Sequence, residues 1–362
     1  MQQIQKRVLV VDDSAFMRRL ITEIVEFRED FCVVGTACNG IEALQRIRAL
    51  SPDIVTLDIA MPEMDGLAAL ERIMDEMPRP VIVVSAAGSS DINASAIRAL
   101  ELGAVEFVRK PSGPVSIDFL SAREQMLRAL EMASMVRFSS RSTARRVTPA
   151  PRLALPRLAS PASAVRPTDR VVVIAASTGG PRALSEVISR LPSTLDAAVL
   201  ILQHMPSEFV PVLADRLGQL GPLQVAVAVD GESILAGRIY LAPGAGQMRV
   251  RRRRGGVTIE IVAGDPVSGL RPSADQLFRS AAKVFGSGVI GVVLSGMGRD
   301  GAEGLRAVRG AGGRAIVQDR ASSIIYGMPG AALATAGADS VVAASRVAGA
   351  ITALLGDDRR VA

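Results

Sequence analysis

The sequence is poor in cysteine, aromatic residues and histidine. Its 362 residues include two cysteines, two tyrosines, no tryptophan and a single histidine, and the aromatic content is 3%. Two cysteines, Cys32 and Cys38, are too few for the disulfide framework of a small secreted domain, and they are consistent with a reducing cytoplasm. The low aromatic content argues against a stacking platform for nucleic-acid bases, so no nucleic-acid partner is expected.

Long apolar runs are also missing. Acidic residues interrupt the N-terminal segment MQQIQKRVLVVDD before it reaches the length of a signal peptide, and no later run approaches a membrane span. We therefore predict a cytoplasmic protein without direct membrane insertion. The content of 49% hydrophobic and 22% charged residues is typical of a soluble globular chain.

A change in composition divides the chain. Between Ser139 and Thr168 the sequence has five prolines and no acidic residue, and it lacks the periodicity of a helix or strand. Such a stretch is typical of a semi-extended linker. We predict a first domain over residues 1–125, a linker over 126–168 and a second domain over 169–356.

In the first domain, short apolar runs alternate with helical patterns. The runs RVLVVD, FCVVGTAC, DIVTLDI, PVIVVSA and VEFVRKP are candidate strands, and the segments between them place apolar residues three and four positions apart. This alternation predicts a doubly wound α/β domain with a five-stranded parallel sheet.

Polar residues stand at the carboxyl ends of these strands, where such sheets bind ligands. Asp12 and Asp13 end the first strand, Asp58 the third, Ser85 the fourth and Lys110 the fifth. Carboxylates suit Mg²⁺, a lysine and a hydroxyl suit phosphate oxygens, and one carboxylate could accept a phosphoryl group. A helix cap would explain Asp13 or Ser14 alone, but it does not explain five matched positions.

The motifs VLVVDDSAFMRRL, TLDIAMPEMDGL, VSA and VEFVRKPSG resemble the receiver domain of two-component response regulators. The resemblance implies that Asp58 is the phosphoacceptor, that Asp12 and Asp13 complete a Mg²⁺ site with it, and that Lys110 contacts the phosphoryl group. It further implies that Ser85 and Phe107 are switch residues that respond to phosphorylation. Without the resemblance, an aromatic residue such as Phe107 in a strand is expected in the core.

The second domain has its own α/β pattern, which predicts a three-layer α/β domain with a mostly parallel sheet. RVVVIAAS, AAVLILQH and VIGVVLSG are expected to form buried parallel strands, whereas GRIYLAPG and GVTIEIVAG alternate more and are expected in a hairpin or at an edge. The segment IAASTGGP places Ser177 in a strand-to-helix turn, without the lysine of a phosphate loop or the glycine spacing of a dinucleotide site. Ser177 is therefore either a plain helix cap or a nucleophile.

The single histidine favours the nucleophile. His204 ends the strand AAVLILQH, at the same kind of strand end as Ser177, and it alone can supply an imidazole base. Asp300 in SGMGRDG has the best context for the third member of a triad, although Asp230, Asp265 and Asp319 are rivals. The order Ser, His, Asp disfavours the typical α/β hydrolase.

Together, ASTGGP, LQHMP, LAPG, SGMGRDG and YGMPGAA resemble the catalytic domain of chemotaxis protein-glutamate methylesterases. The resemblance implies a Ser177, His204 and Asp300 triad, with Thr178 beside the nucleophile and a Met297 backbone N–H at the oxyanion. Two substitutions depart from the family pattern. Ala175 stands where glycine is frequent, and Arg320 stands where an acidic residue is common, which alters the electrostatics expected near the substrate.

The combined resemblance implies a phosphorylation-activated enzyme of chemosensory adaptation. It would hydrolyse glutamate methyl esters on the cytoplasmic domains of chemoreceptors, release methanol and also deamidate receptor glutamines. A chemotaxis histidine kinase would donate the phosphoryl group, and the unphosphorylated receiver would cover the esterase cleft. Mg²⁺ would serve the receiver, and no cofactor is expected for ester hydrolysis.

Two other functions compete with this one. The basic run from Arg249 to Arg254 suggests a DNA-binding transcription factor, but the second domain lacks a helix-turn-helix pattern, and solvated arginines on a hairpin explain the run. Alternatively, the protein is a catalytically silent scaffold that docks to receptors or a kinase. The intact set of Ser177, His204 and Asp300 argues against the scaffold.

Overall fold

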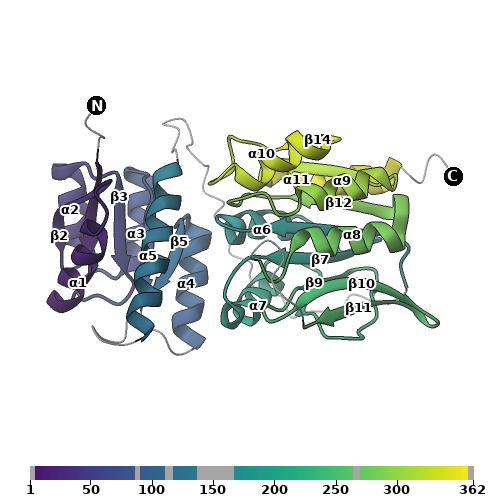
Figure 1. Ribbon diagram of the computed structural model, residues 1–362, viewed down its shortest axis with the longest axis horizontal. Helices are drawn as coiled ribbons and strands as arrows, with labels where there is room; N and C mark the ends of the chain where they lie inside the picture. The colour runs from purple at the N-terminus through teal and green to yellow at the C-terminus, as the bar shows by residue number, and fades with distance from the viewer. Residues whose placement is uncertain (1–4, 86–89, 111–116, 137–166, 264–269, 358–362) are drawn as a thin grey trace. The chain divides into compact units, whose positions relative to one another are not determined.

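The computed structural model describes the chain except for residues 1–4, 86–89, 111–116, 137–166, 264–269 and 358–362 (Figure 1). The chain divides into two compact units, each built around its own parallel sheet. None of the helices in the described part is both long and apolar enough to cross a membrane.

The first unit has a five-stranded parallel sheet in the order β2-β1-β3-β4-β5. Its strands are β1 (Lys6–Val11), β2 (Phe31–Ala37), β3 (Ile54–Asp58), β4 (Val81–Ser85) and β5 (Glu106–Arg109). Its helices are α1 (Ala15–Glu26), α2 (Gly40–Leu50), α3 (Gly66–Glu76), α4 (Ser90–Leu102) and α5 (Ile117–Met135). Helices α1 and α5 contact each other, and α3 contacts α2 and α4 (Figure 1). All five predicted strands are present, and the predicted fold is confirmed.

Polar caps start the helices that follow the strands. The Ser14 hydroxyl accepts a hydrogen bond from the Met17 N–H at the start of α1, and Asn39 and Asp65 cap α2 and α3 in the same way. Each cap satisfies a backbone donor that the first helical turn leaves unpaired. Because Ser14 caps α1, the carboxylates of Asp12 and Asp13 do not serve as the N-cap of this helix.

The end of α5 differs from the predicted linker boundary. The linker was predicted from residue 126, but the helix continues to Met135. Its buried side chains repeat at three- and four-residue spacing, at Met126, Ala129, Leu130 and Ala133. This apolar stripe continues the helix beyond the predicted boundary. Residues 137–166 of the predicted linker lie outside the described residues.

The second unit has a seven-stranded sheet in the order β14-β13-β12-β6-β7-β9-β8, and every neighbouring pair is parallel. Its strands are β6 (Val171–Ala176), β7 (Ala198–Gln203), β8 (Gln224–Val227), β9 (Arg238–Leu241), β12 (Val289–Val293), β13 (Arg314–Gln318) and β14 (Ser340–Val342). The helices that follow these strands along the chain are α6 (Gly180–Ile188), α7 (Val210–Leu220), α8 (Ala274–Phe285), α9 (Ala302–Gly310), α10 (Gly327–Ala336) and α11 (Ala344–Asp357). The predicted second α/β domain is confirmed.

One expectation for this unit is half wrong. GRIYLAPG forms β9, which is an interior parallel strand between β7 and β8 and not part of a hairpin. The side chains of Ile239, Tyr240 and Leu241 are all buried, which explains why the strand pairs on both sides. GVTIEIVAG does form a hairpin, in which β11 (Gly256–Val262) pairs antiparallel with β10 (Gln247–Arg253).

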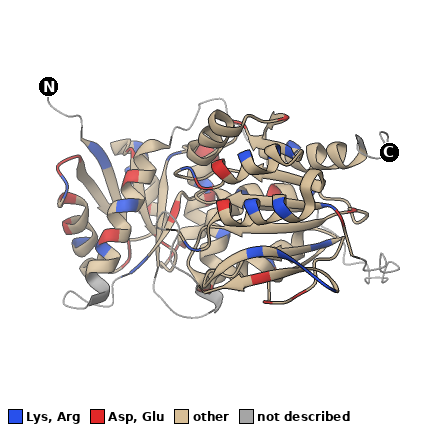
Figure 2. Ribbon diagram, turned by 45° about the vertical axis from the view of Figure 1, so that its right-hand side comes forward, with Lys and Arg blue, Asp and Glu red and all other residues tan. Residues whose placement is uncertain are grey.

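The basic run lies along this hairpin. Figure 2 shows the arginines of β10 in blue. Arg251 pairs with Glu260 of β11 at 2.5 Å, and Arg252 donates a hydrogen bond to the Val284 carbonyl. Arg253 and Arg254 are exposed. The arginines of the run therefore lie on a surface hairpin, which is the explanation given above for this run in place of DNA binding.

A tight contact joins α8 to α9 on one face of the second sheet. A methyl group built on Gly304 of α9 would lie 2.6 Å from Cβ of Phe278 and 2.9 Å from Cα of Asp275, both on α8. Atoms of protein cores do not approach this closely. Gly304 therefore sets the distance between the two helices.

We predict that Gly304→Ala lowers the free energy of unfolding by about 1–3 kcal/mol, because the added methyl group overpacks the α8–α9 contact. Gly310→Ala in the same helix is the matched control, since a methyl group there meets nothing within 4 Å. The control is expected to be neutral or to gain up to about 1 kcal/mol from the better helix propensity of alanine. Calorimetric melts of both variants test the difference, and equal losses would contradict it.

Candidate functional site

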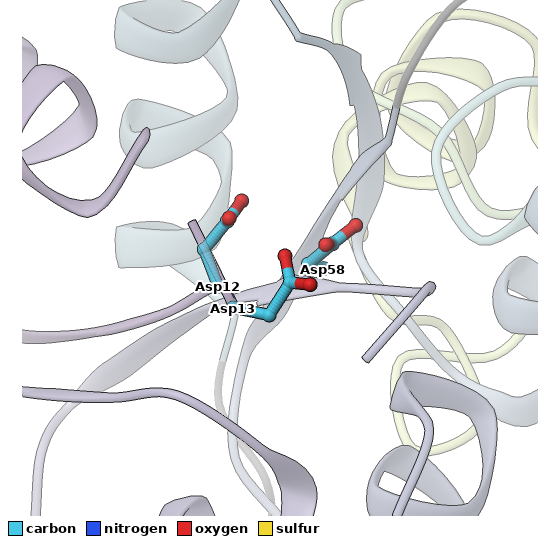
Figure 3. A group of neighbouring side chains, drawn as sticks. All are labelled: Asp12, Asp13 and Asp58. Carbon is cyan, nitrogen blue, oxygen red and sulfur yellow. The ribbon is translucent and has the colours of Figure 1, made fainter. Parts of the chain in front are cut away.

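Three carboxylates meet at the carboxyl edge of the first sheet. Asp12 and Asp13 follow β1, and Asp58 ends β3, the neighbouring strand (Figure 3). One ligand atom from each lies within 4.8 Å of the others. Carboxylate oxygens at this spacing are the hard ligands that Mg²⁺ prefers, so the residues present fit this ion.

Lys110 adds a positive charge to the same edge. Its Nζ lies 2.7 Å from a carboxylate oxygen of Asp12 and 2.7 Å from one of Asp58. Burial acts to lower the pKa of Lys110, but the two carboxylates outweigh burial and raise it above its ordinary value. Burial also raises the pKa of Asp58, although Lys110 opposes this effect.

The two predicted switch residues lie on the neighbouring strands β4 and β5. Ser85 is buried at the end of β4, and its carbonyl accepts a hydrogen bond from the Lys110 N–H. Phe107 in β5 packs against the apolar core beneath the sheet. The edge thus brings together Asp12, Asp13, Asp58, Ser85 and Lys110.

In the second unit, Ser177 lies in the turn between β6 and α6. The turn passes through Gly179, whose φ of 77° is left-handed and favours glycine. The Ser177 N–H donates to the carbonyl of Ser295, which follows β12. Among the described residues, the Ser177 hydroxyl makes no hydrogen bond, so it does not cap α6.

Gln203 holds the backbones of Ser177 and His204 side by side. Its buried Nε2 donates to the carbonyl of Ser177 and to that of His204, at 2.9 Å each. The parallel pairing of β6 with β7 sets the same register, because the His204 N–H donates to the Ala176 carbonyl. The backbones of Ser177 and His204 are therefore held at two adjacent strand ends.

His204 contacts Asp300. Its Nε2 lies 2.9 Å from Oδ2 of Asp300, and both side chains are largely buried. An ionised carboxylate only accepts hydrogen bonds, so this contact places the ring proton on Nε2. Nδ1 is then the nitrogen that can take a proton from a nucleophile.

Asp300 accepts hydrogen bonds from several further donors. Its carboxylate accepts from the N–H groups of Ala274 and Asp275 at the start of α8, from its neighbour Gly301, and from the Ser273 hydroxyl. Burial acts to raise the pKa of Asp300, but the hydrogen bonds from His204 and the backbone outweigh burial and lower it. The carboxylate stays ionised beside the imidazole, and the N-terminus of α8 supports its charge.

The loop after β12 lies against Ser177. A Cβ on Gly296 would lie 2.8 Å from Cβ of Ser177, so only glycine fits there. Met297 follows and its side chain is exposed. Its N–H donates to no backbone carbonyl among the described residues. Thr178 directly follows Ser177 in the β6–α6 turn.

The rival carboxylates serve other parts of the fold. Asp230 accepts from the Ile261 N–H in the hairpin, and Asp319 accepts from the N–H and hydroxyl of Ser322. Asp265 lies outside the described residues. The structure thus places Asp300, and neither Asp230 nor Asp319, against His204.

Three residues of the site, Gln203, Ser273 and Asp275, were not predicted from the sequence. Ser273 and Asp275 stand in RPSADQLF, where a serine before an acidic residue and an apolar pattern is a helix-start signal. That signal locates α8 but not the contact of its first turn with Asp300. Gln203 ends a strand and carries no sequence signal of its own.

Both units match known protein families. The family described as CheB methylesterase matches residues 172–351, and the response regulator receiver domain matches residues 8–118. A protein-glutamate methylesterase/protein-glutamine glutaminase of Syntrophomonas wolfei is 40% identical over 97% of this chain and 99% of its own length. The chain belongs to the CheB methylesterase family. A relative with the same description from Myxococcus xanthus is 43% identical over 96% of both chains.

A solved structure matches the second unit. The CheB methylesterase catalytic domain of Thermotoga maritima is 35% identical and covers 51% of this chain and 98% of its own, with a TM-score of 0.50. The resemblance to the receiver and methylesterase families noted in the sequence is confirmed. Arg320, which stands where the family commonly has an acidic residue, lies over the Tyr326 ring, with 4.5 Å between its Cζ and the ring centroid. The backbone of Tyr326 forms a parallel β-bridge with Gly296.

The lowered pKa of Asp300 predicts how stability depends on pH. Because its folded-state pKa lies below the unfolded one, the ionised carboxylate stabilises the fold above the unfolded pKa of about 4, and this contribution is lost as pH falls through the folded pKa. Asp300→Asn should therefore lower the free energy of unfolding at pH 7 by about 1–3 kcal/mol, with a lower melting temperature. This loss of stability should become progressively smaller as the pH falls.

The exposed Asp215 on α7 supplies the control. Asp215→Asn should change the free energy of unfolding at pH 7 by less than about 0.5 kcal/mol, as is usual for a surface substitution. A cost of Asp300→Asn that grows as the pH falls would contradict the assigned direction of the shift.

Proposed function

We propose that this protein hydrolyses the methyl esters of glutamate side chains on the cytoplasmic domains of chemoreceptors. It releases methanol, and it also deamidates receptor glutamines. Phosphorylation of Asp58 by a chemotaxis histidine kinase raises the rate. One observation carries the proposal. In a chain of this family, Gln203 holds the backbones of Ser177 and His204 at adjacent strand ends, and the His204 ring bonds to Asp300.

In the first half of the proposed reaction, the Ser177 hydroxyl attacks the ester carbonyl while Nδ1 of His204 takes its proton. The resulting imidazolium is stabilised by the ionised Asp300 at 2.9 Å from Nε2. As the tetrahedral intermediate collapses, the imidazolium returns the proton to the leaving oxygen. Methanol departs, and the glutamyl group stays on Ser177 as an ester.

In the second half, His204 takes a proton from water, and the hydroxide attacks the glutamyl-serine ester. Collapse breaks the bond to Ser177, which regains its proton from His204, and a glutamate carboxylate is released. A glutamine side chain offers the same carbonyl with ammonia as the leaving group. Ser177, His204 and Asp300 together supply the nucleophile, the base and the charge stabilisation, so the proposal requires no cofactor for hydrolysis.

The oxyanion of both intermediates needs donors that are fixed in advance. We assign the Met297 N–H to this role because Gly296 packs against Ser177 and the Met297 N–H has no backbone acceptor among the described residues. Thr178 supports the site from the adjoining position in the turn.

In the first unit, Asp58 accepts the phosphoryl group. Asp12, Asp13 and Asp58 would hold Mg²⁺, which supplies charge neutralisation when bound. Lys110 and Ser85 are assigned to the phosphoryl oxygens, and Phe107 to the conformational response. Lys110 suits its role because it already spans Asp12 and Asp58.

Ser177→Ala should abolish methanol release from a methylated chemoreceptor cytoplasmic fragment, by at least about a thousandfold, because the acyl-enzyme cannot form. Ser189→Ala, just after α6, is the matched control and should retain full activity. The assay measures released methanol and mass-shifted receptor peptides. Hydrolysis that survives in Ser177→Ala would remove Ser177 from the mechanism.

Asp58→Asn should prevent a small phosphodonor with Mg²⁺ from raising the rate, while leaving the basal rate in place. Asp75→Asn on the exposed side of α3 should respond like the unaltered protein. Chelating Mg²⁺ should abolish the stimulation but not the basal hydrolysis. A stimulated rate that is the same in Asp58→Asn would exclude Asp58 as the phosphoacceptor.

A further inference from the structure

Two carboxylates, the half-buried Asp275 and the buried Asp300, each accept hydrogen bonds from the backbone segment that carries the other. Asp300 stands just before α9, and its oxygens accept hydrogen bonds from the Ala274 and Asp275 N–H groups at the start of α8. Asp275 stands in the first turn of α8, and its Oδ1 accepts from the Gly301 N–H at 3.0 Å and the Gly304 N–H at 2.7 Å, at the start of α9. Each helix start is thus satisfied by a carboxylate from the other.

Neither helix has a side-chain cap of its own. The N-cap of α9 is Gly301, which has no side chain. The N-cap of α8 is Ser273, whose hydroxyl donates to Asp300 instead of accepting from its own helix. The reciprocal capping therefore replaces two ordinary caps, and it needs the close approach of the helices at Gly304.

The arrangement has an electrostatic cost. Burial raises the pKa of Asp275, and the neighbouring charge of Asp300 adds to this effect, although the N–H groups of Gly304 and Gly301 oppose it. A serine or asparagine would cap α9 without a second negative charge. Asp275 is an acid, and it also binds the N–H of Gly301, the residue directly after Asp300. These two features indicate that Asp275 does more than cap α9.

We propose that Asp275 is a positioning residue for the hydrolytic reaction. By holding Gly301 and Gly304 it fixes the backbone that carries Asp300, and so it fixes the carboxylate against Nε2 of His204. Asp275 touches no reacting atom in this proposal. The inference rests on the proposed esterase function, and it concerns the preorganisation of that same site.

The single histidine gives a direct readout of this positioning. Protein labelled with ¹⁵N-histidine and purified without a histidine tag reports only His204. With Asp300 in place, the ring proton should sit on Nε2. Asp275→Ala should shift part of the population to the Nδ1-protonated tautomer, toward the spectrum of Asp300→Asn, because Asp300 loses its fixed geometry.

The kinetic readout uses two matched variants. Asp275→Ala should lower kcat for methanol release by about tenfold to a hundredfold with little change in KM, since a small displacement of a catalytic group costs this much. Asp275→Asn keeps an acceptor oxygen for Gly301 and Gly304, so it should retain kcat within about threefold and keep the Nε2 tautomer. Rescue by asparagine separates positioning from the charge of Asp275.

The results that would overturn the proposal are distinct from a failure of the function. An unchanged tautomer in Asp275→Ala would refute positioning, whatever happens to kcat. If Asp275→Ala and Asp275→Ser both fail to give a cooperative calorimetric melt, Asp275 is required for folding and the positioning role is refuted. If the unaltered protein hydrolyses no ester, the proposed function fails, while the tautomer spectra still decide whether Asp275 orients Asp300.

Discussion

Parallel pairing of strands is the constraint on which both sites depend. In a parallel sheet, the carboxyl ends of neighbouring strands come out at one edge, and the chain must leave that edge through a turn. In the first unit this brings the ends of β1 and β3 together, and in the second it brings those of β6 and β7 together. Side chains in these turns are close to one another even though they are far apart in the sequence. The chemistry of each unit follows from which polar residues occupy the turns.

The second constraint is the burial of ionised groups. A carboxylate removed from water needs donors on most of its lone pairs. In the first unit the counter-charge is Lys110, placed between two carboxylates. In the second, the donors around Asp300 are chiefly backbone N–H groups, which come with a fixed direction. The first solution is adaptable because a lysine can move, whereas the second is rigid and suits a group that has to orient an imidazole.

Much of the fold could be predicted from the sequence because buried parallel strands are short, apolar and rich in β-branched residues. The five strands of the first unit, and β6, β7 and β12 of the second, were visible in this way. β9 was expected in a hairpin or at an edge because Arg238 and Tyr240 alternate with apolar residues in its sequence. In the structure Tyr240 is buried, and its hydroxyl donates a hydrogen bond to the Ser233 carbonyl. The extent of α5 was missed because a proline-rich segment follows it closely.

The candidate sites divide along similar lines. Residues at strand ends were predictable, since the topology alone brings Asp58, Ser177 and His204 to an edge. The partners that hold them were not. Gln203 acts through its side-chain amide on two carbonyls, and Asp275 acts across a helix contact. Such roles depend on three-dimensional packing, and no spacing along the chain reveals them.

The catalytic roles of Ser177, His204 and Asp300 are proposals, and the methanol-release assays above test them.

The position of β6 in its sheet also affects how the site is assembled. β6 is the first strand of the second unit in the chain, yet it lies in the middle of the sheet, where Ile174 pairs with Val292 of β12. Contacts between such distant segments close a long loop and form late during folding. The Ser177 loop therefore emerges from the ribosome well before Asp300 and α9 can pack beside it. A chain that has not yet been extended to Asp300 lacks the carboxylate that contacts His204, so the complete site can form only after most of the second unit has been synthesised.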